Sequence, residues 1–154
     1  MRGINATFDL QGNSVRRSQW TTTGVVQFPK ALRRLADFGY ITIPLNNDWN
    51  GADFIAQEHD GKSFIKVQLK GRLTFDRKYL GMSLYVCFRD GVGDKSAWYL
   101  YDHDEVLAKL TAQGMIVGTT TWKLNKPYHF STLSEHLKEL LKPYQIPWKT
   151  GLNR

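Results

Sequence analysis

The chain has 154 residues, of which 42% are hydrophobic and 23% are charged, an ordinary composition for a globular domain that excludes wholesale disorder. This length suits one domain with its own core, and no apolar run approaches the roughly 18–20 residues that span a bilayer. The formal net charge of +7 favours a polyanionic partner.

The N-terminus and the cysteine content bear on the compartment. Residues 1–5 lack the continuous apolar stretch of a signal peptide. Cys87 is the single cysteine and lies in the apolar run 84–88, so we interpret it as a buried small hydrophobic residue, and an internal disulfide is excluded. We therefore expect a cytoplasmic protein with no membrane partner.

Lysine and arginine gather in three parts of the sequence. The densest is segment 62–78, where six cations accompany a single acid, Asp76. The others are the pair Arg16–Arg17 and a group around residues 30–34. Any one of these cations is explained equally well by a solvated surface, but their concentration near Gln68 favours nucleic acid. The predicted DNA contacts are Arg16, Arg17, Lys62, Lys66, Arg72, Arg77 and Lys78.

The first predicted helix follows a stretch, residues 1–20, that has no clean period and is a candidate N-terminal arm. Apolar residues recur every three or four positions from Phe28 to Ala36, and Gly39 is the expected stop. Pro29 either begins the regular helix or kinks a longer one that starts near Gly24, and we favour the longer helix. Its opposite side carries Lys30, Arg33, Arg34 and Asp37.

Three strands are predicted next. A short strand at 40–43 ends at Pro44, a turn covers 46–51, and a second strand covers 53–57. The Asp-Gly signal at 59–62 predicts a hairpin loop, which makes 63–69 the antiparallel return strand. Since side chains alternate along a strand, one face should carry Phe64, Lys66, Gln68 and Lys70.

The second half of the chain predicts two more strands and two helices. Strands at 83–88 and 97–101 flank a Gly-rich loop, which we interpret as a hairpin and not as a phosphate cradle, because no helix follows it. Asp102 and Glu105 predict a capping box, and a final helix at 132–141 should stop at Pro143. The order predicts one α/β domain over residues 1–154, with a mixed sheet of four to five strands flanked by helices.

The most informative pattern is an aspartate at the start of one predicted strand and a Gln-x-Lys segment on the next. Asp53 is a candidate ligand for Mg²⁺, which prefers carboxylates, waters and substrate oxygens. Gln68 can add an amide oxygen, and Leu69 can add its backbone carbonyl. Lys70 would act on a phosphate and on the attacking water. These roles match what cleavage of a phosphodiester requires.

At these residues the chain resembles the PD-(D/E)XK nuclease superfamily, in particular the branch of group I intron homing endonucleases and Holliday-junction-resolvase-like proteins. The resemblance covers roughly residues 21–72. It is carried by Gly24-Val25-Val26-Gln27, Leu35, Gly39-Tyr40-Ile41-Thr42-Ile43-Pro44, Asp53 and Val67-Gln68-Leu69-Lys70.

This resemblance implies a restriction-endonuclease-like fold and a metal-dependent DNA endonuclease that uses Mg²⁺, with Mn²⁺ as an alternative. The implied catalytic residues are Asp53, Gln68 and Lys70. Two positions depart from the family pattern: Gln68 stands where an acid is usual, and Gln27 stands where a helix glutamate often aids metal binding. Gln27 and Asp48 are auxiliary candidates.

Two alternatives remain open. One is a DNA-binding relative of the same fold with little or no cleavage, and the other is a module for RNA or single strands whose aromatic residues stack on bases. A binding module should hold its ligand equally well in EDTA. A nuclease that breaks both strands needs two sites, so we expect a homodimer or higher homo-oligomer. The expected interface lies among Trp122, Tyr128, Phe130, Tyr144 and Trp148.

Overall fold

The computed structural model describes residues 22–93 and 96–147. The candidate N-terminal arm, Arg16, Arg17 and Trp148 lie outside the described residues. For residues 22–28 and 46–49, which include Gln27 and Asp48, the description covers the backbone and not the side chains.

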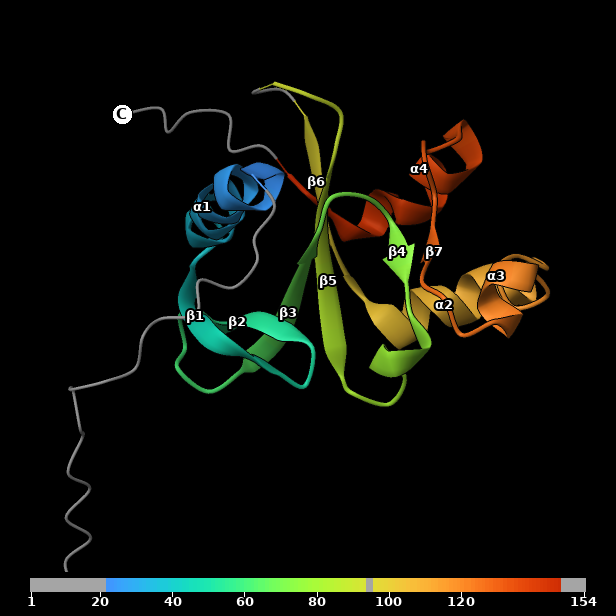
Figure 1. Ribbon diagram of the computed structural model, residues 1–154. Coiled ribbons are helices and arrows are strands. Elements are labelled where there is room, and N and C mark those ends of the chain that lie inside the picture. Colours follow the sequence, from blue (N-terminus) through green and yellow to red (C-terminus); the bar gives the residue numbers. More distant parts are fainter. Residues whose placement is uncertain (1–21, 94–95, 148–154) are drawn as a thin grey trace, which may run out of the picture.

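The protein is an α/β structure built on a mixed six-stranded sheet (Figure 1). The strands β3 and β5 are parallel, and the other neighbouring strands are antiparallel. A separate two-stranded sheet joins β4 and β7. In the order of the large sheet the strands are β1 (Tyr40–Trp49), β2 (Ala52–Glu58), β3 (Phe64–Lys70), β5 (Leu84–Asp90), β6 (Ala97–Asp102) and β8 (Gln145–Ile146); the small sheet holds β4 (Thr74–Phe75) and β7 (Tyr128–His129).

The predicted α/β class and mixed sheet are confirmed, whereas the prediction of four to five strands is wrong. The missing strands β4, β7 and β8 have only two residues each. A two-residue strand is too short to show an alternating pattern, and its pairing is decided by the rest of the fold.

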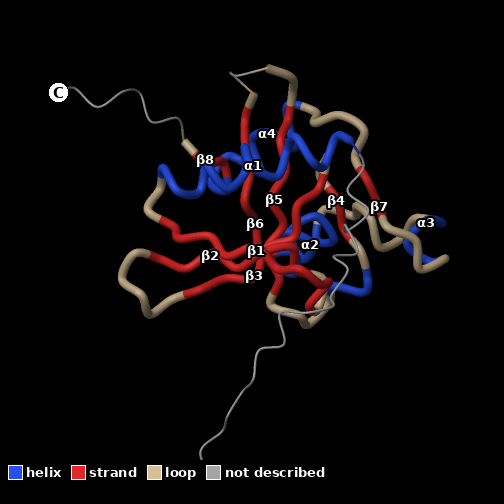
Figure 2. The backbone as a smooth tube through the Cα atoms, turned by 60° about the vertical axis from the view of Figure 1, so that its left-hand side comes forward, coloured by secondary structure: helices blue, strands red, loops and turns tan. Residues whose placement is uncertain are grey.

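Helices cover both faces of the sheet. In Figure 1, α1 lies on one side, and α2, α3 and α4 lie on the other. Figure 2 shows α1 running across the strands. The bounds are α1 (Thr22–Asp37), α2 (His103–Ala112), α3 (Thr120–Lys123) and α4 (Glu135–Leu141), with short 3₁₀ helices η1 (Arg77–Tyr79) and η2 (Lys142–Tyr144).

Each face of the sheet has its own hydrophobic core. On the first face, Ala31 and Leu35 of α1 pack on β-strand residues that include Val67 and Leu69. On the second face, strand residues such as Val86 pack against α2, α3 and α4. Because the central strands are buried from both sides, they read as apolar runs in the sequence.

The first helix confirms the longer of the two predicted alternatives, since Pro29 lies inside α1. The helix ends at Asp37, shortly before the predicted stop at Gly39, whose φ of +84° is a left-handed conformation that suits glycine. One detail is wrong: Arg34, placed on the solvent side, is buried with 9% of its surface exposed. The helix periodicity alone did not show that β6 also packs against this part of α1.

The hairpin β2–β3 forms as predicted, with Phe54 paired to Val67. The loop at its tip is held by Asp60, whose carboxylate accepts the backbone N–H groups of Lys62 and Ser63. The predicted end of β1 at Pro44 is wrong, because β1 continues to Trp49. Pro44 is tolerated there because β1 is an edge strand of the sheet.

The C-terminal half contains the predicted hairpin and both predicted helices, but the last helix begins at Glu135 and not at 132, and α3 was not predicted. Asp102 caps α2 by accepting the N–H groups of Asp104 and Glu105, and Ser134 caps α4. The aromatic residues of this half were expected at an oligomer interface. Trp122 is instead buried in the second core, and Tyr128, Phe130 and Tyr144 pack against it.

Candidate functional site

Asp53, Gln68 and Leu69 converge where β2 and β3 stop pairing. One carboxylate oxygen of Asp53, Oδ2, accepts hydrogen bonds from Gln68 Nε2 at 2.5 Å and from the backbone N–H of Leu69 at 2.7 Å. The same Gln68 nitrogen lies 3.2 Å from the carbonyl oxygen of Leu69. Gln68 Nε2 therefore stands between two oxygens that the sequence proposed as metal ligands.

The local fold explains why these groups meet. The register of β2 and β3 pairs Phe54 with Val67, and one residue further the Asp53 carboxylate binds the N–H of Leu69. Val67 and Leu69 point into the α1 core. Because side chains alternate along a strand, Gln68 faces the other side of the sheet, and Asp53 meets it there.

Lys70 follows on the same face of β3 and lies beside a buried tyrosine. Its ammonium nitrogen is 5.5 Å from the centre of the Tyr79 ring, and that of Lys78 is 5.0 Å from the same centre. Tyr79 itself packs in a small core with Ala52 and Leu84. A cation over an aromatic face is attracted by the ring quadrupole, so Tyr79 attracts the ammonium groups of both Lys70 and Lys78.

A buried histidine anchors the segment that carries Tyr79. His103 is 0% exposed; its Nε2 accepts the backbone N–H of Asp76, and its Nδ1 is 2.7 Å from a carboxylate oxygen of Asp104. A nitrogen that accepts a hydrogen bond cannot carry a proton, so Nδ1 is the protonated position. His103 also contacts Tyr79 edge-on, with ring centres 5.5 Å apart. The histidine thus positions the ring beneath Lys70.

His129 is a neighbour of the site that the sequence did not reveal. Burial lowers its pKa, and the positive charges of Arg72 and Lys70 lower it further. Its Nδ1 is 2.9 Å from the hydroxyl oxygen of Thr74, within the β4–β7 pair. Because 59 residues separate His129 from Lys70 in the chain, no local pattern could have connected them.

The predicted DNA contacts do not all gather at this site. Arg72 and Lys78 lie near it, whereas Lys62 is at the opposite end of β3, roughly 25 Å from Lys70 at about 3.3 Å per residue. The Lys66 ammonium donates to the Met82 carbonyl, and the Arg77 guanidinium lies 5.2 Å from the centre of the Trp122 ring.

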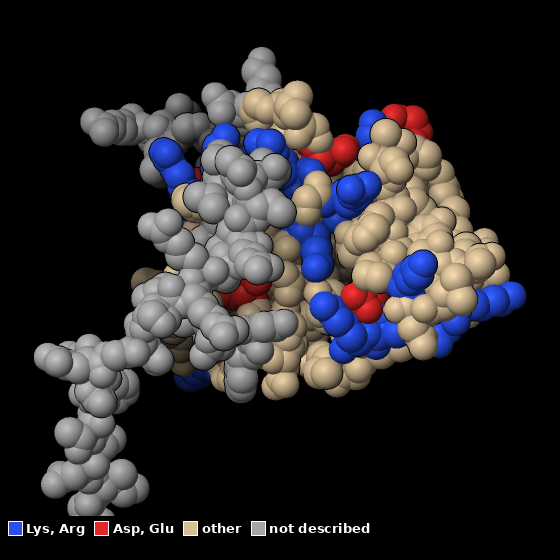
Figure 3. Space-filling model, in the orientation of Figure 1, with Lys and Arg blue, Asp and Glu red and all other residues tan. Residues whose placement is uncertain are grey.

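The surface view shows how the cations are spread. In Figure 3, lysine and arginine side chains run down the middle of the visible face and continue along its lower right edge. The basic side chains on this face thus form a broad band and not one compact cluster.

The auxiliary candidates are placed only by their backbones. Gln27 belongs to α1, which packs on the face of the sheet opposite Gln68. Asp48 belongs to β1, next to the turn at Asn50–Gly51 that leads to Asp53. Both roles stay predictions.

The donor set limits which ion the site can hold. Among the described residues, no group of three or more His, Cys, Asp or Glu side chains lies together. Among the residues whose side chains are described, the candidate ligands are the Asp53 carboxylate, the Leu69 backbone carbonyl and, through its oxygen, the Gln68 amide. Such a set fits Mg²⁺, which is often held by one or two carboxylates together with waters and substrate phosphates.

Nucleophilic catalysis by cysteine has less support among the described residues. Burial raises the pKa of the Cys87 thiol to about 12, so this thiol carries almost no thiolate at neutral pH and is a poor nucleophile. The prediction that Cys87 is a buried apolar residue is confirmed. None of the helices in residues 22–93 and 96–147 has the length and apolar character needed to cross a membrane.

Comparisons of this chain with protein-family models, with curated proteins and with solved structures found no match.

Proposed function

We propose that the protein is a divalent-metal-dependent DNA endonuclease of restriction-endonuclease-like fold. The observation that carries the proposal is the convergence of Asp53, Gln68 and Leu69 at the end of β3, with Lys70 on the same face. These residues share one hairpin in a mixed sheet that helices flank on both sides, which supports the finer assignment of the fold.

The Gln68 amide supports a cation site in particular. Its Nε2, a group of partial positive charge, lies 2.5 Å from the Asp53 carboxylate and 3.2 Å from the Leu69 carbonyl. A half-turn of the amide exchanges its nitrogen and oxygen. After that exchange the Gln68 oxygen would face the oxygens of Asp53 and Leu69, and a cation such as Mg²⁺ or Mn²⁺ would offset the repulsion among the three.

Each residue then has a role in phosphodiester hydrolysis. A divalent ion at this position supplies neutralisation of phosphate charge and a water of lowered pKa. Asp53 provides the anionic ligand. Lys70 places a positive charge against the scissile phosphate and orients the attacking water. Tyr79, fixed by His103, keeps the Lys70 ammonium on this side of the sheet.

Cleavage assays on two variants test the proposal. Asp53→Asn removes the carboxylate that meets Gln68 and Leu69, and Lys70→Ala removes the cation; each should reduce Mg²⁺-dependent cleavage of plasmid and branched DNA by about a hundredfold or more. Lys138→Ala, on the exposed side of α4, is the control and should cleave like the parent. Asp53→Asn keeps an oxygen that can accept the Leu69 N–H, so the fold should persist.

The same assay separates the alternatives. Cleavage in EDTA, or full activity in either site variant, would remove the proposed site. A parent that binds DNA but does not cut it with Mg²⁺ or Mn²⁺ would support the non-cleaving relative instead. Equal binding of single-stranded RNA with and without EDTA, and no duplex cleavage, would favour the strand-binding module.

A further inference from the structure

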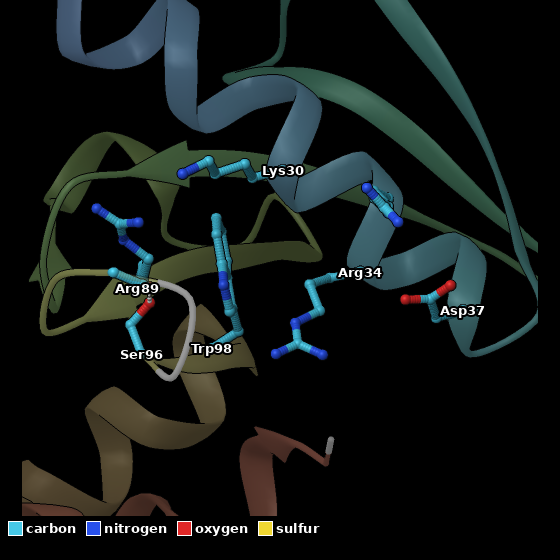
Figure 4. Close-up of a pocket in the computed structure, with 8 residues that line it drawn as sticks. Lys30, Arg34, Asp37, Arg89, Ser96 and Trp98 are labelled. Atoms are coloured by element: carbon cyan, nitrogen blue, oxygen red, sulfur yellow. Dashed lines mark hydrogen bonds between the residues drawn. The ribbon is translucent and has the colours of Figure 1, made fainter. Parts of the chain in front are cut away.

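A second cluster of cations lies on the opposite face of the sheet from Asp53. It lines a cavity of about 400 Å³ between α1 and the ends of β5 and β6. Figure 4 shows Lys30, Arg34 and Arg89 arranged around the ring of Trp98. The charged residues that border the cavity are Lys30, Arg33, Arg34, Asp37 and Arg89.

The cavity has a rigid floor. Trp98 is 5% exposed and belongs to the same core as Leu35 of α1. Arg89 and Trp98 are paired across β5 and β6, so both project toward α1. Arg34 is the neighbour of Leu35 in the helix and is 9% exposed. Packing of α1 on the sheet therefore fixes the position of a largely buried guanidinium.

Cations outnumber acids among the described residues that line this cavity. They are Lys30, Arg33, Arg34 and Arg89, with Asp37 as the described carboxylate. Like charges held together disfavour the folded state, and a bound anion relieves that repulsion. Three of the cations are guanidinium groups, whose planar forks match the oxygens of a phosphate group.

The cavity and the candidate active site flank the same edge of the sheet. Lys70 pairs with Phe88 in the parallel strands β3 and β5, and Arg89 is the next residue. Because β3 and β5 are parallel, their carboxyl ends lie side by side, and this end of the two strands is the edge meant here. Lys70 and Phe88 face one side, and Arg89 faces the other. A polynucleotide that passes over this edge can touch both sites.

We propose that the cavity holds a phosphate group of the DNA strand whose scissile bond lies at Asp53 and Lys70. This inference rests on the proposed function. It assigns to Arg34 and Arg89 a binding role that the sequence did not give them. A free phosphate or a nucleotide offers the same chemistry, so the test includes both sources.

The test compares two double variants of the full chain. Lys30→Ala/Arg89→Ala removes two cations from the cavity, whereas Lys138→Ala/Lys142→Ala removes two exposed cations from the α4 region as the control. Affinity for a labelled DNA duplex is measured across a series of salt concentrations with Ca²⁺ in place of Mg²⁺. The cavity variant should bind about tenfold more weakly or worse, and its salt slope should be smaller by about one for each lost phosphate contact.

A conservative variant addresses the fork geometry and guards against misfolding. Arg89→Lys keeps the charge but loses the bidentate fork, so its salt slope should stay near that of the parent while its affinity falls. Urea unfolding of each variant checks that it is folded. A cavity variant that is folded and binds DNA like the control would overturn the proposal.

Titration with inorganic phosphate and with a nucleoside triphosphate distinguishes the sources. The indole N–H signal of Trp98, assigned with Trp98→Phe, should shift when duplex DNA is added, and the free anions should compete only at millimolar concentration. A shift at micromolar phosphate together with unchanged DNA affinity in the cavity variant would show a free-anion site and refute the strand contact.

The outcome for the cavity is separable from the outcome for the nuclease. If the parent never cleaves DNA but the cavity variant binds DNA more weakly than the control, the phosphate contact is supported and the proposed nuclease activity is refuted. If the parent cleaves DNA and the cavity variant binds like the control, only the phosphate contact is refuted.

Discussion

Gln68 is the central residue of the candidate metal site, because its amide lies between Asp53 and the Leu69 carbonyl. In the metal-free protein the amide stabilises this arrangement by donating to both oxygens. A carboxylate at the same position would repel Asp53 until a cation joined them. Metal affinity and metal-free stability should therefore change in opposite directions when this residue is altered.

Gln68→Glu should tighten Mg²⁺ and Mn²⁺ binding by about tenfold and lower the stability of the metal-free protein by about 1–3 kcal/mol, because the hydrogen bonds to Asp53 and Leu69 are lost. Calorimetric titration and urea unfolding measure the two effects. Gln57→Glu is a matched control at the far end of the same hairpin, where the amide donates to the Gly61 carbonyl. Unchanged metal affinity in Gln68→Glu would exclude Gln68 from the metal site.

The pKa of His129 depends on the positive charges around Lys70. Burial lowers its pKa first, and Arg72 and Lys70 lower it further. Between the lowered pKa and the ordinary one, the unfolded chain binds the proton and the folded protein does not. Stability contributed by neutral His129 is thus lost as the pH falls through this window and is restored as the pH rises.

Arg72→Ala should raise the pKa of His129 toward its ordinary value, because one of the charges that disfavour the imidazolium is removed. An NMR titration of the imidazole protons measures this directly. Arg77→Ala is the control, since Arg77 belongs to the same basic segment but is not among the groups that shift His129. If the two variants titrate alike, Arg72 does not act on His129.

At the scale of elements, the turn between β1 and β2 packs against the Tyr79 ring and limits its position. Gly51 has φ of +80°, and a methyl group added there would lie 2.8 Å from an atom of the Tyr79 ring. Gly61, in the turn between β2 and β3, has a similar φ of +70°, but an added methyl group would meet nothing within 4 Å. The two glycines therefore separate backbone strain from ring contact.

Gly61→Ala should cost about 1–2 kcal/mol of unfolding free energy from the left-handed backbone alone. Gly51→Ala should cost about 1–3 kcal/mol more, since the buried ring must shift, and DNA cleavage should fall because Tyr79 underlies Lys70. Urea unfolding of both variants gives the difference. Equal losses of unfolding free energy would mean that the Tyr79 ring can shift without destabilising the protein and that this turn does not position the site.

At the scale of the whole molecule, assembly stays a prediction, and the C-terminal aromatics expected at the interface pack in or on the second core as far as the structure describes them. Exposed apolar residues occur on β1 and β3: Ile41 is 53% exposed, Ile43 is 48% exposed and Phe64 is 63% exposed. The register aligns Ile41 with Gln57 and Gln57 with Phe64. These side chains thus share the sheet face that also carries Gln68.

If the protein forms the expected homodimer, we predict that this apolar face joins the two copies, since a break in both strands needs two sites. Ile41→Asp/Ile43→Asp should convert the dimer to a monomer that nicks DNA, because it buries charge at the contact. Leu124→Asp, at a residue that is 60% exposed beyond α3, should leave the assembly unchanged. Light scattering at micromolar protein measures the mass; a monomeric parent, with and without DNA, would refute the prediction.

The sequence by itself determined the parts of the protein that rest on local physics. The alternation of Ile65, Val67 and Leu69 with Lys66, Gln68 and Lys70 specified which face of β3 is buried, since a strand has a period of two. The Asp-Gly turn specified the hairpin, and Asp102 specified the start of α2, because turn and capping chemistry act over a few residues. The pairing of Asp53 with Gln68 followed from these elements.

Tertiary structure alone decided what depends on residues far apart in the chain. The strands β4, β7 and β8 exist because other strands pair with them, and the extension of β1 through Pro44 depends on its place at the sheet edge. The contacts of His103 with Asp76 and of His129 with Thr74 cross 27 and 55 residues. Arg34 is buried because β6 packs beside α1. Periodicity records which side of an element is apolar, but it does not record which element covers that side.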